Sequence, residues 1–179
     1  MSSYLRPQSL LRLLALSGLL WTGMAQADMY NDVSKLTRSG KTAEAIAKAD
    51  QYLNTNSRDP QMRFLKGVAQ SKSGDLAAAT NTFEALIEEY PELPEPYNNL
   101  AVIYANDGQL EKARNALEIA VRNNPNYAVA HENLGDIHAR LAHQAYNKSL
   151  QLNDNNRALK LKLSTLTSML QPAQPTAER

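Results

Sequence analysis

The chain has 179 residues, of which 43% are apolar and 21% charged, and its 19 lysines and arginines nearly balance its 18 acidic residues. These values are typical of a soluble globular protein, and they argue against a nucleic-acid-binding protein, which needs a surplus of basic residues. Because the chain contains no cysteine, a disulfide, a thiolate metal site and a lipid-modified cysteine are all excluded. The residue pattern indicates a mostly helical protein.

The N-terminal 27 residues have the three parts of a secretory signal peptide. Arg6 and Arg12 precede a short apolar run that ends at Trp21, and the small residues Ala25 and Ala27 form a signal-peptidase site. The apolar run is shorter than the roughly 20 residues that a membrane-spanning helix needs. We therefore expect cleavage after Ala27 and export to the periplasm rather than an uncleaved membrane anchor.

A spacing of 34 residues organises the chain after this segment. Glycines recur at this spacing, at Gly40, Gly74 and Gly108, and so do alanines, at Ala45, Ala79 and Ala113. Glycine permits a tight turn between two helices, and alanine lets two helix backbones approach closely. In the third repeat, large residues such as Tyr97 and Leu117 alternate with these small ones. This pattern resembles the tetratricopeptide repeat, a pair of antiparallel helices.

The resemblance implies an all-α fold, a tetratricopeptide-type α-solenoid of antiparallel helix pairs that ends in a C-terminal capping helix. Three repeats are expected, at about residues 26–59, 60–93 and 94–127. A fourth, contracted repeat is expected at residues 128–154, where the turn glycine is missing.

The C-terminal part of the chain departs from the repeat. No glycine or proline occurs between Asp136 and Gln171, so residues 128–152 are predicted to form one long helix. A turn with a helix cap follows at residues 154–156, and a capping helix at about residues 155–170 presents Leu159, Leu163, Leu166 and Leu170 on one side. Residues 171–179 are interpreted as a disordered tail.

The three histidines lie in the predicted long helix. His131 and His138 are seven residues apart, about 10 Å along a helix, which is too far for both to bind one zinc ion. They stand where packing aromatics are usual, so we interpret them as core or boundary residues. The sequence contains no phosphate-binding loop, nucleophile motif or metalloprotease motif. It therefore predicts no catalytic site, no metal and no cofactor, and a protein that is not an enzyme.

The resemblance also implies a concave groove, lined by the first helix of each repeat, that binds a peptide. Carried onto this sequence, the groove residues are Tyr30, Arg38, Gln61, Phe64, Lys72, Asn98, Val102, Asn106, Glu132, Asp136 and Arg140. The groove is expected to be basic and aromatic in its first half and acidic near Glu132 and Asp136. For Phe64 a role in the core is the alternative, and Asp136 with Arg140 has the spacing of a helix-surface ion pair.

These observations predict a periplasmic scaffold or adaptor whose groove binds a peptide segment of an envelope protein, part of the outer-membrane, pilus or peptidoglycan machinery. Two alternatives stay open. One is a self-associating module that forms a homodimer through helices 128–170, where a missing turn leaves apolar residues unmatched. The other is an accessory module of a cell-wall enzyme. The expected partner is a protein or peptide, with no nucleic acid and no transmembrane segment after signal cleavage.

Overall fold

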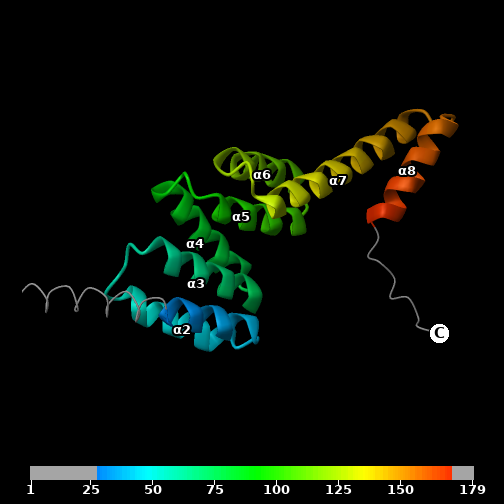
Figure 1. Ribbon diagram of the computed structural model, residues 1–179. Coiled ribbons are helices and arrows are strands. Elements are labelled where there is room, and N and C mark those ends of the chain that lie inside the picture. Colours follow the sequence, from blue (N-terminus) through cyan, green and yellow to red (C-terminus); the bar gives the residue numbers. More distant parts are fainter. Residues whose placement is uncertain (1–27, 171–179) are drawn as a thin grey trace, which may run out of the picture. The chain divides into compact units, whose positions relative to one another are not determined.

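The computed structural model describes residues 28–170, and every regular element in this range is an α-helix. The predicted signal peptide, residues 1–27, and the predicted disordered tail, residues 171–179, lie outside the described residues. The chain divides into two units, residues 1–82 and 83–179, with the boundary inside helix α4 (Leu76–Glu89). Figure 1 labels the helices from α2 to α8. Within residues 28–170, no helix is long and apolar enough to cross a membrane.

Unit 1 contains a helix over residues 28–38, then α2 (Thr42–Leu53), α3 (Pro60–Ser73) and the first part of α4. Its core is built from Val33, Ala45, Ala49, Met62 and Ala69, which are fully buried. Three of these five residues are alanines, so the helices pack closely around the two larger side chains. Helix α3 contributes Met62 and Ala69 to this core.

A carboxylate ties together three segments of unit 1. Asp59 precedes α3, and its Oδ1 accepts a hydrogen bond from the Met62 amide at 3.0 Å, which caps the helix. Its Oδ2 accepts hydrogen bonds from the hydroxyls of Tyr30, at 2.5 Å, and Tyr52, at 2.8 Å. The two tyrosine rings meet edge to face, with 6.0 Å between their centroids. Asp59 thereby joins α3 to the helix over residues 28–38 and to α2.

Unit 2 contains the rest of α4, then α5 (Pro94–Asn106), α6 (Leu110–Asn123), α7 (Ala128–Leu152) and α8 (Arg157–Leu170). Helix α6 packs against both α5 and α7, and α8 packs against α7. The core lies between α5, α6 and the first half of α7, where Leu117, Ala113 and Ile137 are buried. Beside this core, burial and a hydrogen bond from its hydroxyl to Glu84 raise the pKa of Tyr104.

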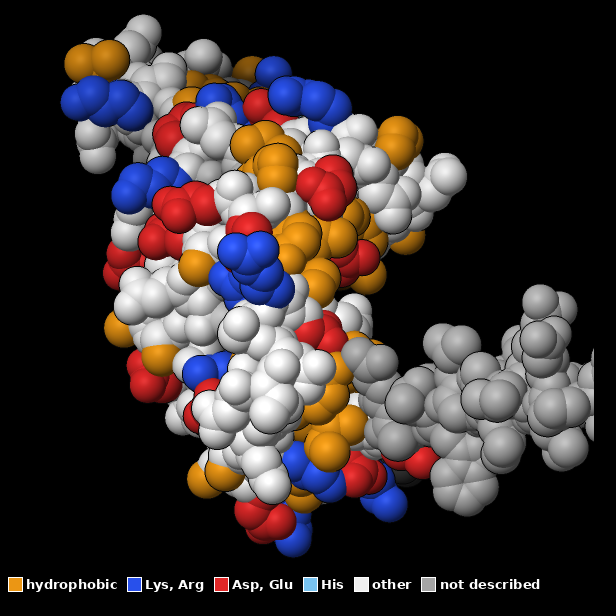
Figure 2. Space-filling model, turned by 90° about the vertical axis from the view of Figure 1, so that its left-hand side faces the viewer, with side chains coloured by type: hydrophobic (Ala, Val, Ile, Leu, Met, Phe, Trp, Pro, Cys, Tyr) orange, Lys and Arg blue, Asp and Glu red, His pale blue; other side chains and the backbone are white. Residues whose placement is uncertain are grey.

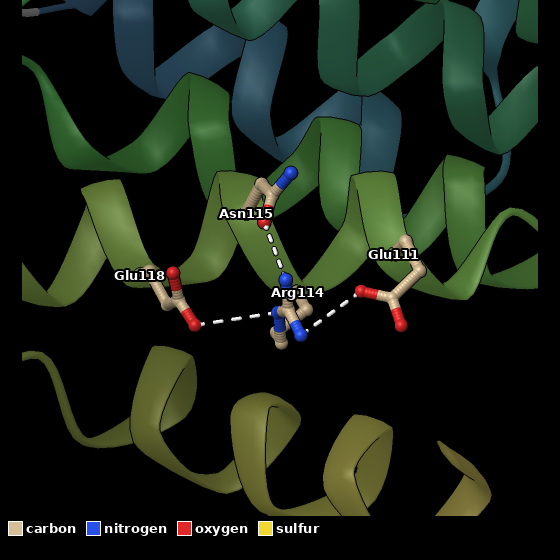
Figure 3. A network of polar contacts seen from close by, with 4 residues as sticks. All are labelled: Glu111, Arg114, Asn115 and Glu118. Atoms are coloured by element: carbon tan, nitrogen blue, oxygen red, sulfur yellow. Dashed lines mark hydrogen bonds and ion pairs between the residues drawn. The ribbon is translucent and has the colours of Figure 1, made fainter.

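Helix α6 carries a small network of charged residues around Arg114, which is half-buried. The Arg114 guanidinium lies 3.0 Å from the Glu111 carboxylate and 3.4 Å from that of Glu118, and it also donates to Asn115 (Figure 3). Such pairs one turn apart stabilise a helix by roughly 0.2–0.5 kcal/mol each.

Figure 2 shows a molecular face on which basic and acidic side chains lie close together, with apolar side chains between them.

The repeated glycines make the turns that their spacing predicts. Gly40, Gly74 and Gly108 have φ angles of 81°, 88° and 78°, the left-handed region that side chains disfavour. Each turn links the two helices of one repeat, and these are the three tetratricopeptide-type hairpins that the sequence predicts.

Two glycines give a test of this backbone requirement. Gly108→Ala should destabilise the protein by about 1–2 kcal/mol because alanine is strained at positive φ, although no atom lies within 4 Å of the added methyl group. Gly135 lies inside α7, also with free space around it, so Gly135→Ala should stabilise the protein by about 0.5–1 kcal/mol. Urea unfolding measures the free energy of unfolding of both variants. A change of the same sign in the two would contradict the conclusion that Gly108 is required for its positive φ and Gly135 is not.

The long helix predicted at residues 128–152 is confirmed. Helix α7 runs without a break for 25 residues, from Ala128 to Leu152. The predicted cap is also present, because Asn156 Oδ1 accepts a hydrogen bond from the Leu159 amide at 3.0 Å. The four leucines predicted to share one side of α8 are all half-buried: Leu159, Leu163, Leu166 and Leu170.

Candidate peptide-binding cavity

A cavity of about 350 Å³ opens on unit 2 between α5, α7 and the end of α8. Its floor is apolar, since it contains the buried side chains of Ala101, Leu117 and Ile137. Ala101 and Ala105 of α5, Leu117 of α6 and Ile137 of α7 are among its lining residues. Val102 lies at the edge with 42% of its surface exposed, so a ligand can contact an apolar side chain there.

Arg140 forms part of the polar rim and also holds the end of α5. Its guanidinium donates to the carbonyl oxygen of Ala105 at 2.8 Å. In unit 1, Lys72 Nζ donates a hydrogen bond at 3.1 Å to the carbonyl oxygen of Arg38, which lies 34 residues earlier in the chain. Both acceptors lie in the last turn of a helix, where the carbonyls lack partners within the helix and carry partial negative charge. Two predicted ligand-binding cations therefore cap a neighbouring helix.

Asp136 is the acidic group of the rim. It is exposed, and within the described part of the chain no ion pair joins it to Arg140. The predicted helix-surface ion pair is therefore wrong, because Arg140 turns to the α5 carbonyl instead. The Asp136 carboxylate faces the cavity with Asn106, which is also exposed. These two side chains offer a charge and an amide to a ligand.

The two predicted groove asparagines of α5 differ in their surroundings. Asn98 is only 6% exposed, and its side-chain oxygen accepts a hydrogen bond from Asn133 Nδ2 at 2.8 Å. Asn133 of α7 lines the cavity, whereas Asn98 lies behind it. Two amide side chains therefore line the cavity: Asn106, which the repeat positions indicated, and Asn133, which they did not.

Helix α8 supplies a wall that sequence reasoning missed. Met169 and Leu170 line the cavity although they follow Arg140 by about 30 residues. The leucine spacing of α8 predicts an amphipathic helix, but it does not say which end of α8 returns to α5.

The remaining predicted groove residues lie elsewhere. Tyr30 and Gln61 line a shallow, open depression on unit 1 beside residues 55–60. Arg38 is exposed and Phe64 half-buried in the same unit. In unit 2, Glu132 is exposed but does not line the cavity. The structure therefore brings together Val102, Asn106, Asp136 and Arg140, and no other predicted groove residue lines this cavity.

The histidines do not lie as expected. His131 and His138 are exposed, so their interpretation as core or boundary residues is wrong. The reason is that α7 continues past the position of the usual turn, so no second helix of the same repeat folds back over these positions. His143 is half-buried, with its Nε2 3.2 Å from the Thr167 hydroxyl of α8. Among residues 28–170, no cluster of histidines and acids could hold a metal ion.

Comparison with known proteins agrees with the repeat architecture. Two models of the tetratricopeptide repeat match the chain, at residues 36–94 and 71–137. Photosystem I assembly protein Ycf3 of Prochlorococcus marinus (strain NATL1A) is 27% identical over 108 residues. The match covers 59% of this chain and 62% of that protein, so the chain spans less than two thirds of this relative.

Solved structures show the same fold. A thermophilic tetratricopeptide protein of Thermus thermophilus has a TM-score of 0.60 at 24% identity, and the match covers 80% of this chain and 82% of the other. The first repeat domain of Spaghetti (RPAP3), bound to the HSP90 peptide SRMEEVD, has a TM-score of 0.59 at 19% identity, with coverage of 65% and 92%. The paired helices, the glycine turns and the matched repeat models place the chain in the family of tetratricopeptide repeat proteins.

Proposed function

We propose that this protein is a periplasmic scaffold that binds a peptide segment of an envelope protein in the cavity between α5 and α7. Tetratricopeptide repeat proteins are typically non-enzymatic and bind protein or peptide partners, which supports a scaffold role. One observation carries the proposal: Val102, Asn106, Asp136 and Arg140, chosen from repeat positions, line a single cavity.

The cavity wall indicates which peptide chemistry fits. An apolar side chain of the peptide would pack on Val102 and Met169, which are both exposed. The Asn106 amide can donate to a peptide carbonyl and accept from a peptide N–H. Asp136, which has no ion pair with Arg140, would attract a lysine or arginine of the peptide. We therefore favour a segment with an apolar residue next to a basic one.

Location and partner follow from other observations. The signal-peptide pattern of residues 1–27 supports export to the periplasm. The matched relative is named as an assembly protein, and a matched structure contains a bound peptide. Both support a role in which the chain holds another protein. We propose that this protein belongs to the outer-membrane, pilus or peptidoglycan machinery.

Site-specific crosslinking in the intact periplasm tests this function. With the photo-reactive residue benzoylphenylalanine in place of Val102, we expect a covalent adduct with a partner protein, which mass spectrometry then identifies. The same residue in place of Arg122, an exposed position of α6 outside the cavity, is the control and should give no such adduct.

A charge reversal sharpens the experiment. Asp136→Lys in the Val102 crosslinking background should reduce the adduct severalfold, because the change repels a basic peptide. Asp136 is exposed, so this variant should fold normally, which circular dichroism checks. Equal adducts from positions 102 and 122 would contradict a binding role for the cavity.

A further inference from the structure

A second surface of unit 2 lies open between α7 and α8. The depression there has a volume of about 450 Å³, and its walls are mostly apolar: Ala142, Tyr146, Leu161, Leu166 and Met169, with Lys162 at the edge. Leu161 and Met169 are each 69% exposed, and α8 has no buried side chain at all. This depression, which we call the α7–α8 groove, is distinct from the peptide cavity, although Met169 contacts both.

The earlier helices of unit 2 have a neighbour that covers their apolar side. Helix α6 packs between α5 and α7, and α7 also contacts α5. For the pair formed by α7 and α8, no described helix occupies the corresponding place. Large exposed apolar side chains gathered on one face are characteristic of an interaction surface.

The shape of the groove fits a helix. Two packed helices present ridges of side chains, and a third helix lies in the groove between them. Leu161, Thr165 and Met169, which are four residues apart, form one such ridge on α8. Half-buried residues such as Tyr146 and Leu166 lie deeper in the groove, where apolar side chains of a bound helix can reach them and a flat bilayer surface cannot.

The positive charge of α8 indicates the charge that a partner should carry. The helix carries Arg157, Lys160 and Lys162 and no acidic residue. Lys162 lies at the groove itself. A second copy of the chain would bring the same cations against these, which is unfavourable. An acidic partner would pair with them.

We propose that the α7–α8 groove binds an acidic amphipathic helix of a partner protein. The bound helix takes the place that the first helix of a following repeat would occupy, with leucine-like residues in the groove and aspartates or glutamates against Lys162. The linings of the α7–α8 groove and of the peptide cavity have one residue in common, Met169, so the scaffold can hold a separate segment at each.

A designed peptide tests the proposal with the chain of residues 28–179. The probe is a fluorescent 18-residue helical peptide with leucines on one face and glutamates beside them, and its binding is followed by fluorescence anisotropy. Leu161→Ser should weaken binding about tenfold or more, because it removes an apolar contact. Leu152→Ser is the matched control, since Leu152 is 77% exposed but does not line the groove.

Charge variants test the sign. Lys162→Glu should weaken binding of the glutamate peptide severalfold and strengthen binding of the same peptide with lysines in place of glutamates. Lys160→Glu, the same change outside the groove lining, should have a smaller effect. Asp136→Lys should leave binding of the glutamate peptide unchanged, because Asp136 lines the peptide cavity and not the α7–α8 groove. The proposed function of the cavity and the proposal for the groove can therefore fail independently of each other.

Three results would overturn the proposal. The first is equal binding of the glutamate and lysine peptides. The second is a dimer in sedimentation equilibrium that Leu161→Ser dissociates, since the groove would then bind a second copy. The third is that the protein binds vesicles with anionic lipids, that Leu161→Ser abolishes this binding, and that the protein does not bind the glutamate peptide. The surface would then be a membrane contact.

Discussion

Replacing Leu117 with alanine is expected to lower the free energy of unfolding by about 2–5 kcal/mol, the usual cost of a large cavity in a packed core. Leu117 is 1% exposed and belongs to the core between α5, α6 and α7. Truncation would also enlarge the candidate cavity, because Leu117 is one of the residues that form its floor. Urea unfolding followed by circular dichroism measures the change.

The control for this variant is Val102→Ala. Val102 lines the same cavity but is 42% exposed, so the loss should stay within about 0.5 kcal/mol, as for most surface changes. A loss for Leu117→Ala no larger than for Val102→Ala would show that the core of unit 2 is not packed as described.

Replacing Asp59 with alanine is expected to destabilise the protein by about 2–4 kcal/mol. The change removes a helix cap, worth about 1 kcal/mol, and two hydrogen bonds from tyrosines to a charged group, each worth about 1.5–3 kcal/mol. Both bonds are only part-buried, so water bonds the freed hydroxyls and the expected loss is below the sum of these values. The lost contacts join Tyr30 and Tyr52 to the start of α3. The same urea experiment measures the loss.

Asp75 provides a matched control for Asp59. Its Oδ1 accepts a hydrogen bond from the Ala78 amide at 3.0 Å at the start of α4, but the residue is exposed. Asp75→Ala should therefore cost only the cap, about 1 kcal/mol. Equal losses for the two variants would mean that the tyrosine hydroxyls contribute nothing. Amide hydrogen exchange should place the Asp59→Ala effect in unit 1 and the Leu117→Ala effect in unit 2.

Local sequence signals accounted for most of the helices. The spacing of Gly40, Gly74 and Gly108 predicted three turns, and all three residues have positive φ. The absence of glycine and proline between Asp136 and Gln171 predicted the unbroken α7. These signals are reliable because backbone freedom at a turn depends on the residue itself and little on its distant neighbours.

The candidate sites were predictable only in part. Repeat positions identified Val102, Asn106, Asp136 and Arg140, because side chains at fixed positions of a regular helix pair point the same way. They did not identify Asn133, Met169 or Leu170, which line the same cavity. Helix α8 follows no repeat pattern, so nothing in its sequence says where its end packs.

Side-chain partners depended on the packed structure throughout. The resemblance to the repeat places Lys72 and Arg140 in the groove, yet each donates to a carbonyl at the end of a neighbouring helix. His131 and His138 occupy packing positions of the repeat and are exposed. The hydrogen-bond partners of the two cations and the exposure of the two histidines both depend on which helix end or helix face lies nearby.

The sequence by itself determined the all-helical architecture, the 34-residue repeat, the glycine turns and the long α7, because these depend on local backbone preferences and on the periodic placement of large and small residues. Only the tertiary structure decided which groups line the candidate cavity and that no helix within residues 28–170 covers the α7–α8 groove. Those features depend on contacts between helices distant in the chain, such as Leu117, Arg140 and Met169 at one cavity, and the residue pattern of a single helix does not specify its neighbours.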